Sequence, residues 1–280
     1  MIAPAAEISI AEALAWARQH IQPPEARLLL RHICHTSIAH IAAWPEKRLP
    51  VTQWETFRHL VERRASGEPI AYLTGEREFY GRNFLVNASV LIPRPETELL
   101  VERAVAHYAA VPCPKVLDLG TGSGILAVTL ALELDRPEIT AIDASRDALV
   151  VAATNALRFG VTISFLWSDW YALLKREDRF QFIVANPPYI DDDDSHLTQG
   201  DLRFEPLGAL ASGRGGLQAL TAIVSGAGRH LENGGWLFLE HGYNQATTVR
   251  GLLTGAGFAN ISSWKDIAGI ERVSAGRWTG

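Results

Sequence analysis

Short apolar segments and longer helical segments alternate along the chain from residue 115 onward. The short apolar segments have the length and β-branched content of strands. The longer segments that separate them carry apolar residues at helical spacing. We expect strands at 115–119, 138–143, 161–167, 180–186 and 235–240, and helices at 123–134, 145–158, 215–231 and 244–256. The late runs 258–264 and 270–278 predict a closing antiparallel hairpin. This alternation predicts an α/β fold, a mostly parallel sheet covered by helices on both faces.

The first 75 residues lack this alternation and predict a small helical domain. Ser9 followed by Glu12 is a capping-box pattern, and residues 25–35 and 52–64 carry apolar side chains at helical spacing. Prolines punctuate the chain between these helices, and no strand pattern is visible.

Aromatic and β-branched runs flank Gly81-Arg82-Asn83 in the next segment, which favours a hairpin. Pro95 then begins a further helix that reaches Tyr108. We therefore expect three parts: a helical domain at 1–75, a β-hairpin linker at 76–92 and an α/β domain at 93–280.

The charge distribution argues against a polynucleotide substrate. The net charge of the 280 residues is −5, with +1 on residues 1–75 and −6 on the rest. Neither part is the basic platform that usually holds nucleic acid by its phosphates. We expect no direct contact with nucleic acid.

The cysteines and the apolar segments indicate where the protein works. Cys34 and Cys113 match no metal-ligand or redox spacing, so we expect no metal site and a reducing cytoplasm. The amino terminus has no basic leader region, and no stretch approaches the ~20 apolar residues of a membrane-spanning helix. A cytoplasmic protein that does not bind membranes is expected.

A glycine-rich turn joins a predicted strand to a helix in KVLDLGTGSGILAV, residues 115–128. Its loop consists of Gly120, Thr121, Gly122, Ser123 and Gly124. Such a turn is tight enough for a ligand to lie against backbone N–H groups at the helix start, although a sharp turn alone would also need glycine. Asp143 ends the next strand, 23 positions beyond Gly120, where a carboxylate can accept from both ribose hydroxyls. With that partner, the loop favours cofactor binding.

The spacing of the loop selects among cofactors. Ile125 stands where the dinucleotide pattern requires glycine, and no Walker loop is present. An adenosyl cofactor without a pyrophosphate, such as S-adenosyl-L-methionine, tolerates this loop. After the third strand, Asp169 can accept from an adenine amino group and Trp170 can cover the ring, although Asp169 alone is more typical of a helix cap or turn.

The tetrapeptide Asn186-Pro187-Pro188-Tyr189 follows the fourth predicted strand, at the sheet edge where α/β proteins bind ligands. The Asn186 side-chain oxygen and the Pro187 carbonyl can both accept from one NH₂ group. Prolines fix the backbone without competing N–H groups, and Tyr189 can stack on a planar substrate. The alternative is a stiff turn with a core tyrosine. This pattern suits methyl transfer to a carboxamide or an exocyclic base amine, for which neither a metal nor a strong general base is needed.

The chain resembles the HemK/PrmC protein-(glutamine-N5) methyltransferases, which modify class-1 peptide chain release factors. The matching segments are GEPIAYLTGEREFYG at 67–81, LIPRPETE at 91–98, DLGTGSG at 118–124, NPPYI at 186–190, GDLRFEPLGAL at 200–210 and LEHG at 239–242. Only NPPY is shared with DNA adenine methyltransferases.

The resemblance implies a seven-stranded methyltransferase domain of Rossmann-like type and a helical domain that helps grip the release factor. It also implies that residues 120–124, Asp143, Trp170 and Asn186 hold S-adenosyl-L-methionine, which leaves as S-adenosyl-L-homocysteine. Residues 186–189 would hold the glutamine of the factor's Gly-Gly-Gln tip, and the enzyme would support translation termination as a monomer. Arg94 and Glu96 would lie near the cofactor, though an ion pair and a helix cap explain them equally well.

Three rival hypotheses remain at this point. A nucleic-acid adenine-N6 methyltransferase would use the same NPPY site but needs a basic recognition surface. A dehydrogenase would need the missing dinucleotide glycine. A scaffold that has lost catalysis would tolerate changes at Asn186 or in the glycine loop, and both are intact.

Overall fold

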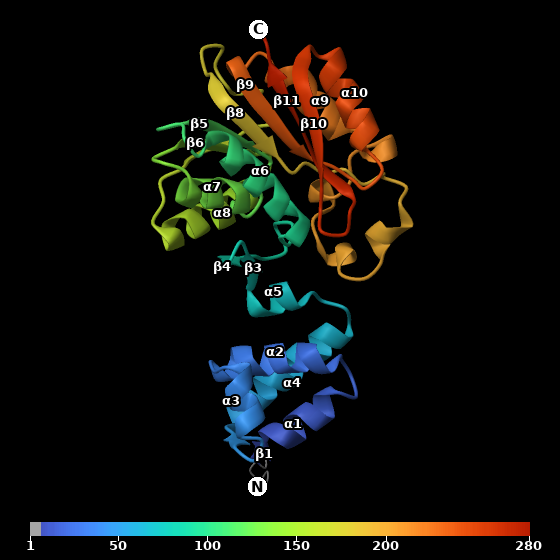
Figure 1. Cartoon of the computed structure of the whole chain (residues 1–280). Helices are drawn as coiled ribbons and strands as arrows, with labels where there is room; N and C mark the ends of the chain where they lie inside the picture. Colours follow the sequence, from blue (N-terminus) through green and yellow to red (C-terminus); the bar gives the residue numbers. More distant parts are fainter. Residues whose placement is uncertain (1–6) are drawn as a thin grey trace. The chain divides into compact units, whose positions relative to one another are not determined.

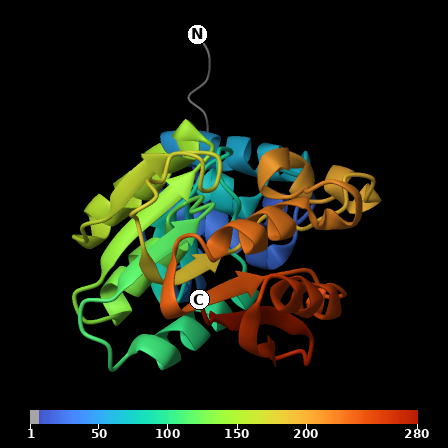
Figure 2. The ribbon, with the colours of Figure 1, turned by 90° about the horizontal axis from the view of Figure 1, so that it is seen from above.

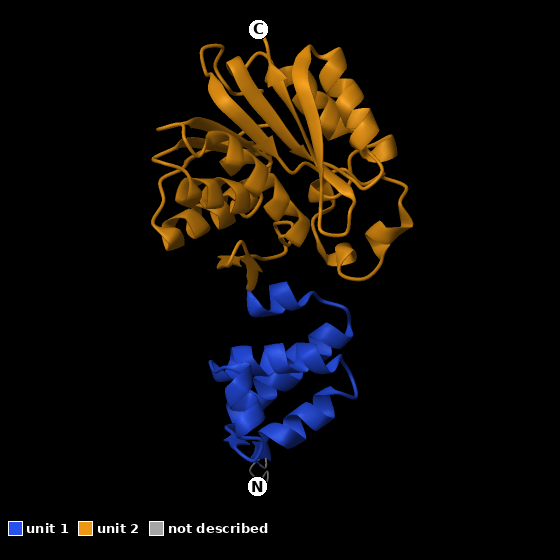
Figure 3. Cartoon of the chain, viewed as in Figure 1, with its two compact units in different colours: residues 1–75 blue, residues 76–280 orange. Residues whose placement is uncertain are grey.

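The structure is a computed structural model that describes residues 7–280. The chain divides into two compact units, residues 1–75 and 76–280 (Figure 3). The first six residues, which belong to the terminus expected to carry no leader, lie outside the described part. Within residues 7–280, no helix is both long and apolar enough to cross a membrane.

The first unit is built from helices around one apolar core. Its helices are α1 (Ile10–Ala17), α2 (Pro23–Cys34), α3 (Ile38–Ala43), α4 (Val51–Ala65) and α5 (Ile70–Thr74). Leu29, Leu30 and Phe57 are completely buried in this core. The capping box is confirmed, because the Ser9 N–H donates to Glu12 Oε2 over 2.8 Å and the Glu12 N–H donates to Ser9 Oγ over 3.3 Å.

The expectation that the first unit contains no strand is wrong. Two-residue strands β1 (Ile8–Ser9) and β2 (Arg48–Leu49) pair antiparallel. Two residues cannot show the alternation that identifies a strand, so only the tertiary pairing reveals them. Helices α3 and α5 also went unidentified, because each has six residues or fewer.

The second unit contains a seven-stranded sheet in the order β10-β11-β9-β8-β5-β6-β7 (Figure 1). Its strands are β5 (Lys115–Leu119), β6 (Glu138–Asp143), β7 (Ser164–Trp167), β8 (Phe180–Ala185), β9 (Leu231–Glu240), β10 (Phe258–Lys265) and β11 (Glu271–Trp278). Strands β5 to β9 pair in parallel, whereas β11 pairs antiparallel with both β9 and β10. The predicted α/β fold and the closing hairpin are confirmed.

Helices cover both faces of this sheet (Figure 2). They are α6 (Glu98–Tyr108), α7 (Ile125–Glu133) and α8 (Arg146–Phe159) in one layer, and α9 (Gln218–Ala227) and α10 (Ala246–Gly255) in the other. Successive strand residues point to opposite layers: Val116, Phe182 and Phe238 to the first, Leu117, Ile183 and Leu239 to the second. Burial on both faces explains why these strands are continuously apolar.

Two predicted boundaries are wrong for reasons visible in the backbone. The helix expected at 215–231 is shorter because Gly213, Gly215 and Gly216 all have positive φ, so α9 begins only at Gln218. The strand expected at 161–167 begins at Ser164, because Gly160 caps α8 in the left-handed conformation and the Val161 N–H donates to the Ala156 carbonyl.

The hairpin of β3 (Glu76–Phe79) and β4 (Arg82–Leu85) lies within the second unit, and a buried amide connects it to helix α8. Asn155 of α8 accepts from the Leu85 N–H over 2.8 Å and donates to the Leu85 carbonyl over 3.0 Å. The same side chain donates to the Ser123 carbonyl in the glycine loop over 2.8 Å. Asn155 therefore joins the hairpin to the glycine loop. Leu85 of the hairpin lies 70 residues before Asn155 in the sequence, and Ser123 of the loop lies 32 residues before it.

We predict that Asn155→Ala lowers the free energy of unfolding by about 2–4 kcal/mol, because it removes three hydrogen bonds from a fully buried site. Urea denaturation followed by circular dichroism measures this. Thr154→Ala, at the adjacent exposed position, is the control and should stay within about 0.5 kcal/mol of wild type. Equal losses in the two variants would contradict the role of Asn155.

Candidate active site

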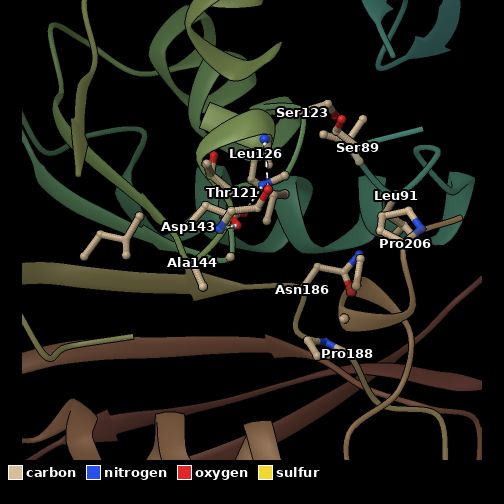
Figure 4. A pocket seen from close by; sticks show the side chains of 18 of the residues that line it. Ser89, Leu91, Thr121, Ser123, Leu126, Asp143, Ala144, Asn186, Pro188 and Pro206 are labelled. Atoms are coloured by element: carbon tan, nitrogen blue, oxygen red, sulfur yellow. Dashed lines mark hydrogen bonds between the residues drawn. The ribbon is translucent and has the colours of Figure 1, made fainter. Parts of the chain in front are cut away.

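A pocket of about 380 Å³ lies at the carboxyl ends of β5, β6, β7 and β8 (Figure 4). The chain order of the strands reverses between β5 and β8, and open α/β sheets bind ligands at such a point. Gly120, Asp143, Asp169 and Asn186, which follow or end these four strands, all line the pocket. Residues predicted from four separate segments thus lie around one space.

The glycine loop fits this pocket closely. Gly120, Gly122 and Gly124 have φ values of +72°, +56° and +82°, which favour glycine. A Cβ on Gly124 would lie 3.1 Å from the backbone of Ala152 in α8, so the loop also needs glycine for packing. Thr121 and Ser123 are buried between the glycines and line the pocket.

The N–H groups of the loop are not the free donors that we expected. Those of Gly120 and Thr121 both donate to the Ile142 carbonyl over 2.9 Å, and that of Gly124 donates to the Thr121 carbonyl over 2.8 Å. The Gly122 N–H donates to Asp143 Oδ2 over 2.8 Å. The fold uses these donors itself, so this loop lets a ligand approach closely rather than cradling an anion.

Asp143 lies at the end of β6 with its carboxylate partly committed to the backbone. Besides Gly122, the Ser145 N–H donates to it, reaching Oδ1 over 2.8 Å. Burial raises the pKa of Asp143, while these hydrogen bonds act in the opposite direction. A carboxylate offers about four acceptor positions, so capacity for ligand hydroxyls is left.

Asp169 and Trp170 both line the pocket, as their placement after the third strand predicts. Trp170 has φ +45°, an uncommon value for a bulky residue, and its ring lies 3.5 Å from where a Gly120 Cβ would be. Asp169 is exposed, and its carboxylate makes no hydrogen bond or ion pair with residues 7–280. The cap of the following turn is Ser168, whose hydroxyl accepts from the Leu173 N–H.

Within the tetrapeptide, Asn186 and Pro188 line the pocket, whereas Pro187 and Tyr189 do not (Figure 4). The Asn186 Nδ2 group donates to Thr97 Oγ1 over 3.1 Å. Its Oδ1 atom is buried and has no hydrogen-bond partner in the described structure. A buried acceptor without a partner is costly, so it points to a ligand N–H group.

Tyr189 packs against the second core cluster and donates from its hydroxyl to Glu240 Oε1 over 3.2 Å. Burial raises the pKa of Tyr189, and the neighbouring Glu240 adds to this. Its backbone carbonyl accepts from Gln245 Nε2 over 3.0 Å. The structure therefore places the ring in the core rather than on the pocket wall.

The opposite wall of the pocket was not predicted. The buried side chain of Glu205 holds together the two segments that form this wall. The lining residues of the wall are Ser89, Val90, Leu91, Pro93, Pro206, Gly208 and Ala209. Glu205 Oε1 accepts from Arg94 Nη2 over 2.5 Å, and Oε2 accepts from the Ile92 N–H over 2.9 Å. Of the two explanations offered for Arg94, the structure therefore shows the ion pair. Its partner, Glu205, belongs to the RFEP sequence at residues 203–206, which is one of the segments that resemble the family.

Asp118 at the end of β5 is a second unpredicted feature. Its Oδ2 atom accepts from Thr121 Oγ1 over 2.7 Å and from the Ala127 N–H over 3.2 Å, and Oδ1 has no partner in the described structure. Burial raises the pKa of Asp118 to about 7. The carboxyl group ties the glycine loop to the start of α7.

Comparisons with known proteins identify the family. The PrmC N-terminal domain matches residues 8–75, and the methyltransferase small domain matches residues 95–202. The release factor glutamine methyltransferase of Bordetella pertussis is 48% identical over 90% of this chain and 93% of its own length. That of Burkholderia pseudomallei is 48% identical over 91% and 92%. The chain belongs to the release factor glutamine methyltransferase family.

Membership of this family accounts for both units, since the two relatives align over nearly the full chain. A solved methyltransferase structure from Pyrococcus furiosus matches 78% of this chain and 98% of its own with a TM-score of 0.54. Its sequence identity is 14%, so this likeness concerns the fold. The seven-stranded methyltransferase fold that the resemblance implied is confirmed.

We predict that Asp118→Asn flattens the pH dependence of stability. The folded-state pKa of about 7 exceeds the ordinary value of 3.8, so the protonated carboxyl stabilises the fold at low pH and that stability is lost as pH rises through 7. Between pH 5 and pH 8, the wild type should lose about 2–3 kcal/mol more free energy of unfolding than the variant.

Urea denaturation at the two pH values measures this difference. Asp147→Asn, at an exposed position of α8, is the matched control and should keep the wild-type pH dependence. A parallel pH dependence in wild type and Asp118→Asn would show that Asp118 does not titrate in this way.

Proposed function

We propose that this protein transfers a methyl group from S-adenosyl-L-methionine to the side-chain amide nitrogen (N5) of the glutamine in the Gly-Gly-Gln motif of class-1 peptide chain release factors. The observation that carries the proposal is the buried, unpartnered Oδ1 atom of Asn186 beside the pocket. An amide acceptor held there suits a substrate that presents an NH₂ group. The enzyme would support translation termination in the cytoplasm.

The pocket residues fit S-adenosyl-L-methionine better than a dinucleotide. A pyrophosphate needs free N–H donors, and four of the five residues of the glycine loop already use theirs. Asp143 has acceptor capacity for ribose hydroxyls, and Asp169 and Trp170 lie where they can meet an adenine. The carboxylates of Asp143 and Asp169, which both line the pocket, give the site acidic character, which suits a cationic cofactor. When bound, the cofactor supplies an activated methyl group.

The protein's own part in the reaction is to orient the acceptor nitrogen. Asn186 Oδ1 would accept one amide hydrogen of the substrate glutamine, and the Pro187 carbonyl the other, so that the nitrogen is held toward the cofactor. Neither proline carries an N–H group that could compete for these acceptors. The amide nitrogen loses its proton after methyl transfer, so no strong general base is required.

The helical unit, residues 1–75, is proposed to help grip the release factor. Its match to the PrmC N-terminal domain supports this assignment, and both relatives whose names specify release factors align across it. Its charge of +1 gives no basic surface for a polynucleotide. We propose a monomeric enzyme that meets no nucleic acid directly.

Transfer of radiolabelled methyl from S-adenosyl-L-methionine tests the function. A class-1 release factor, the same factor with Gln→Ala at its Gly-Gly-Gln tip, and duplex DNA are offered in parallel. Label on the intact factor alone is expected. Label on DNA would overturn the substrate and favour an adenine-N6 methyltransferase that uses the same tetrapeptide.

We predict that Asn186→Ala lowers the rate of methyl transfer at least ~10²-fold, as when a preorganised hydrogen-bonding group is removed from other active sites. The fold and the dissociation constant of the cofactor should change little, because Asn186 contributes one of many pocket contacts. Asn83→Ala, at an exposed position of β4, should retain full activity. Activity of Asn186→Ala within a few-fold of wild type would contradict the role of the tetrapeptide.

We predict that Asp143→Ala weakens binding of S-adenosyl-L-methionine by about 1–3 kcal/mol, because a charged hydrogen-bond acceptor is lost. The Gly122 N–H also loses its partner, which adds to the effect. Isothermal titration with S-adenosyl-L-methionine measures the change, and titration of the wild type with NAD is the control, with no binding expected. An unchanged dissociation constant in the variant would remove Asp143 from the cofactor site.

A further inference from the structure

The backbone of the tetrapeptide is held mainly at its two ends. Asn186 follows β8, so the sheet holds the first end. The two prolines in the middle have no N–H group to donate. At the second end, the Tyr189 N–H donates to the Leu210 carbonyl over 3.2 Å, and the Tyr189 carbonyl accepts from Gln245 Nε2 over 3.0 Å. Gln245 is thus the side chain that holds the backbone of the second end.

The amide of Gln245 is buried and can bind in one orientation only. The residue precedes α10 and is 7% exposed. Its Oε1 atom accepts from the Gly242 N–H over 2.8 Å. Its Nε2 atom faces three carbonyls, those of Tyr189 and Gly215 at 3.0 Å and that of Gly216 at 3.3 Å. A backbone N–H only donates and a carbonyl only accepts, so exchanging Oε1 and Nε2 would break every one of these bonds.

Glycine permits the close approach of the segments that Gln245 joins. A Cβ on Gly216, whose φ is +65°, would lie 2.0 Å from the Tyr189 carbonyl oxygen. A Cβ on Gly242 would lie 3.0 Å from Gln245 Oε1 and 3.5 Å from the Tyr189 ring. Side chains at either position would therefore disturb the contact between Gln245 and Tyr189.

We propose that Gln245 is a positioning residue for methyl transfer: its amide fixes the Tyr189 end of the tetrapeptide and thereby places the Pro187 carbonyl and Asn186 Oδ1. This inference rests on the proposed function, because those two acceptors are the ones assigned to the substrate amide. Gln245 lies outside the lining of the pocket that residues 7–280 form. It acts on the reaction through the backbone of the tetrapeptide.

The two prolines carry the position of Tyr189 to the acceptors. Each proline ring locks φ near −65°, so this stretch has fewer soft torsions than an ordinary loop. A shift of the Tyr189 backbone is therefore passed on to the Pro187 carbonyl rather than absorbed between them. Misplacement of a reacting group by about 1 Å can slow a reaction ~10²-fold, so a small shift is enough to matter.

A purely structural role for Gln245 predicts a different result. Loss of its hydrogen bonds from a buried site would lower the free energy of unfolding in either case. If stability were the whole role, the folded fraction of a variant would transfer methyl at the wild-type rate. The rate constant of folded enzyme, measured well below the unfolding transition, therefore separates the two roles.

Gln245→Met is the first test, because methionine has a similar length and lacks the amide. With cofactor and release factor saturating, single-turnover methyl transfer should slow at least ~10-fold. The dissociation constant of S-adenosyl-L-methionine should stay within about 2-fold, since Gln245 does not line the pocket. Thr248→Ala, at an exposed position of α10, is the control and should keep the wild-type rate. A smaller decrease in Gln245→Met overturns the proposal.

Gln245→Glu is the second test. Glutamate keeps an acceptor for the Gly242 N–H but places a second oxygen against three carbonyls, which cannot donate to it. Methyl transfer should slow at least as much as in Gln245→Met. A wild-type rate in this variant overturns the proposal, and it decides the question if Gln245→Met does not fold.

A spectroscopic readout separates this inference from the proposed function. In ¹H–¹⁵N spectra of the free protein, the Asn186 side-chain NH₂ signals should shift in Gln245→Met and should not shift in Thr248→Ala. This measurement needs no methyl acceptor. Shifted Asn186 signals together with no label on the release factor would refute the function alone, whereas unshifted signals in Gln245→Met would refute the positioning role.

Discussion

The parallel pairing of β5 with β8 is the contact on which the site depends. Leu119 lies opposite Ala185, so the residues that follow, Gly120 and Asn186, emerge from the sheet next to each other. Polar side chains follow here because the strands, which are buried on both faces, end at Leu119 and Ala185. Since β5 and β8 also mark the reversal of strand order, the crevice between the two helical layers opens at this point. One register therefore places the glycine loop and Asn186 together.

Five buried side-chain atoms have no hydrogen-bond partner within residues 7–280, and three of them lie at the ends of strands β5, β8 and β9; the other two are Arg103 Nε and Thr129 Oγ1. Asp118 Oδ1, Asn186 Oδ1 and Glu240 Oε2 are all buried without a partner in the described structure. Each such atom costs free energy that the surrounding apolar layers must offset. Two of these atoms belong to the carboxyl groups of Asp118 and Glu240. Burial is the main reason why the pKa of each group is raised to about 7. Carboxyl groups with strongly shifted pKa values next to a pocket are typical of a functional site, although structural networks produce them too.

Sequence periodicity was sufficient for the sheet but not for the details of the site. The strands were predictable because each is continuously apolar, and Asn186 could be placed because Pro187 had to end one of them. Glu205 and Thr97 could not be found in this way, since their partners lie 111 and 89 residues away. The pairing of the loop N–H groups was also hidden, because their acceptor, the Ile142 carbonyl, belongs to another strand. The local sequence pattern therefore identified the helices and strands. The partners of the hydrogen bonds could be identified only from contacts between residues that lie far apart in the sequence.

Selectivity for a protein amide has to arise outside the tetrapeptide. Asn-Pro-Pro-Tyr can present its acceptors to a glutamine carboxamide and to an adenine amine alike, because both offer two hydrogens on a planar nitrogen. The pocket walls are largely apolar, and Leu91, Pro93 and Pro206 contribute to them. The pocket lining within residues 7–280 contains no lysine or arginine, and the nearby Arg94 is paired with Glu205. The chemistry at Asn186 therefore admits two kinds of acceptor, and groups outside the tetrapeptide must select between them.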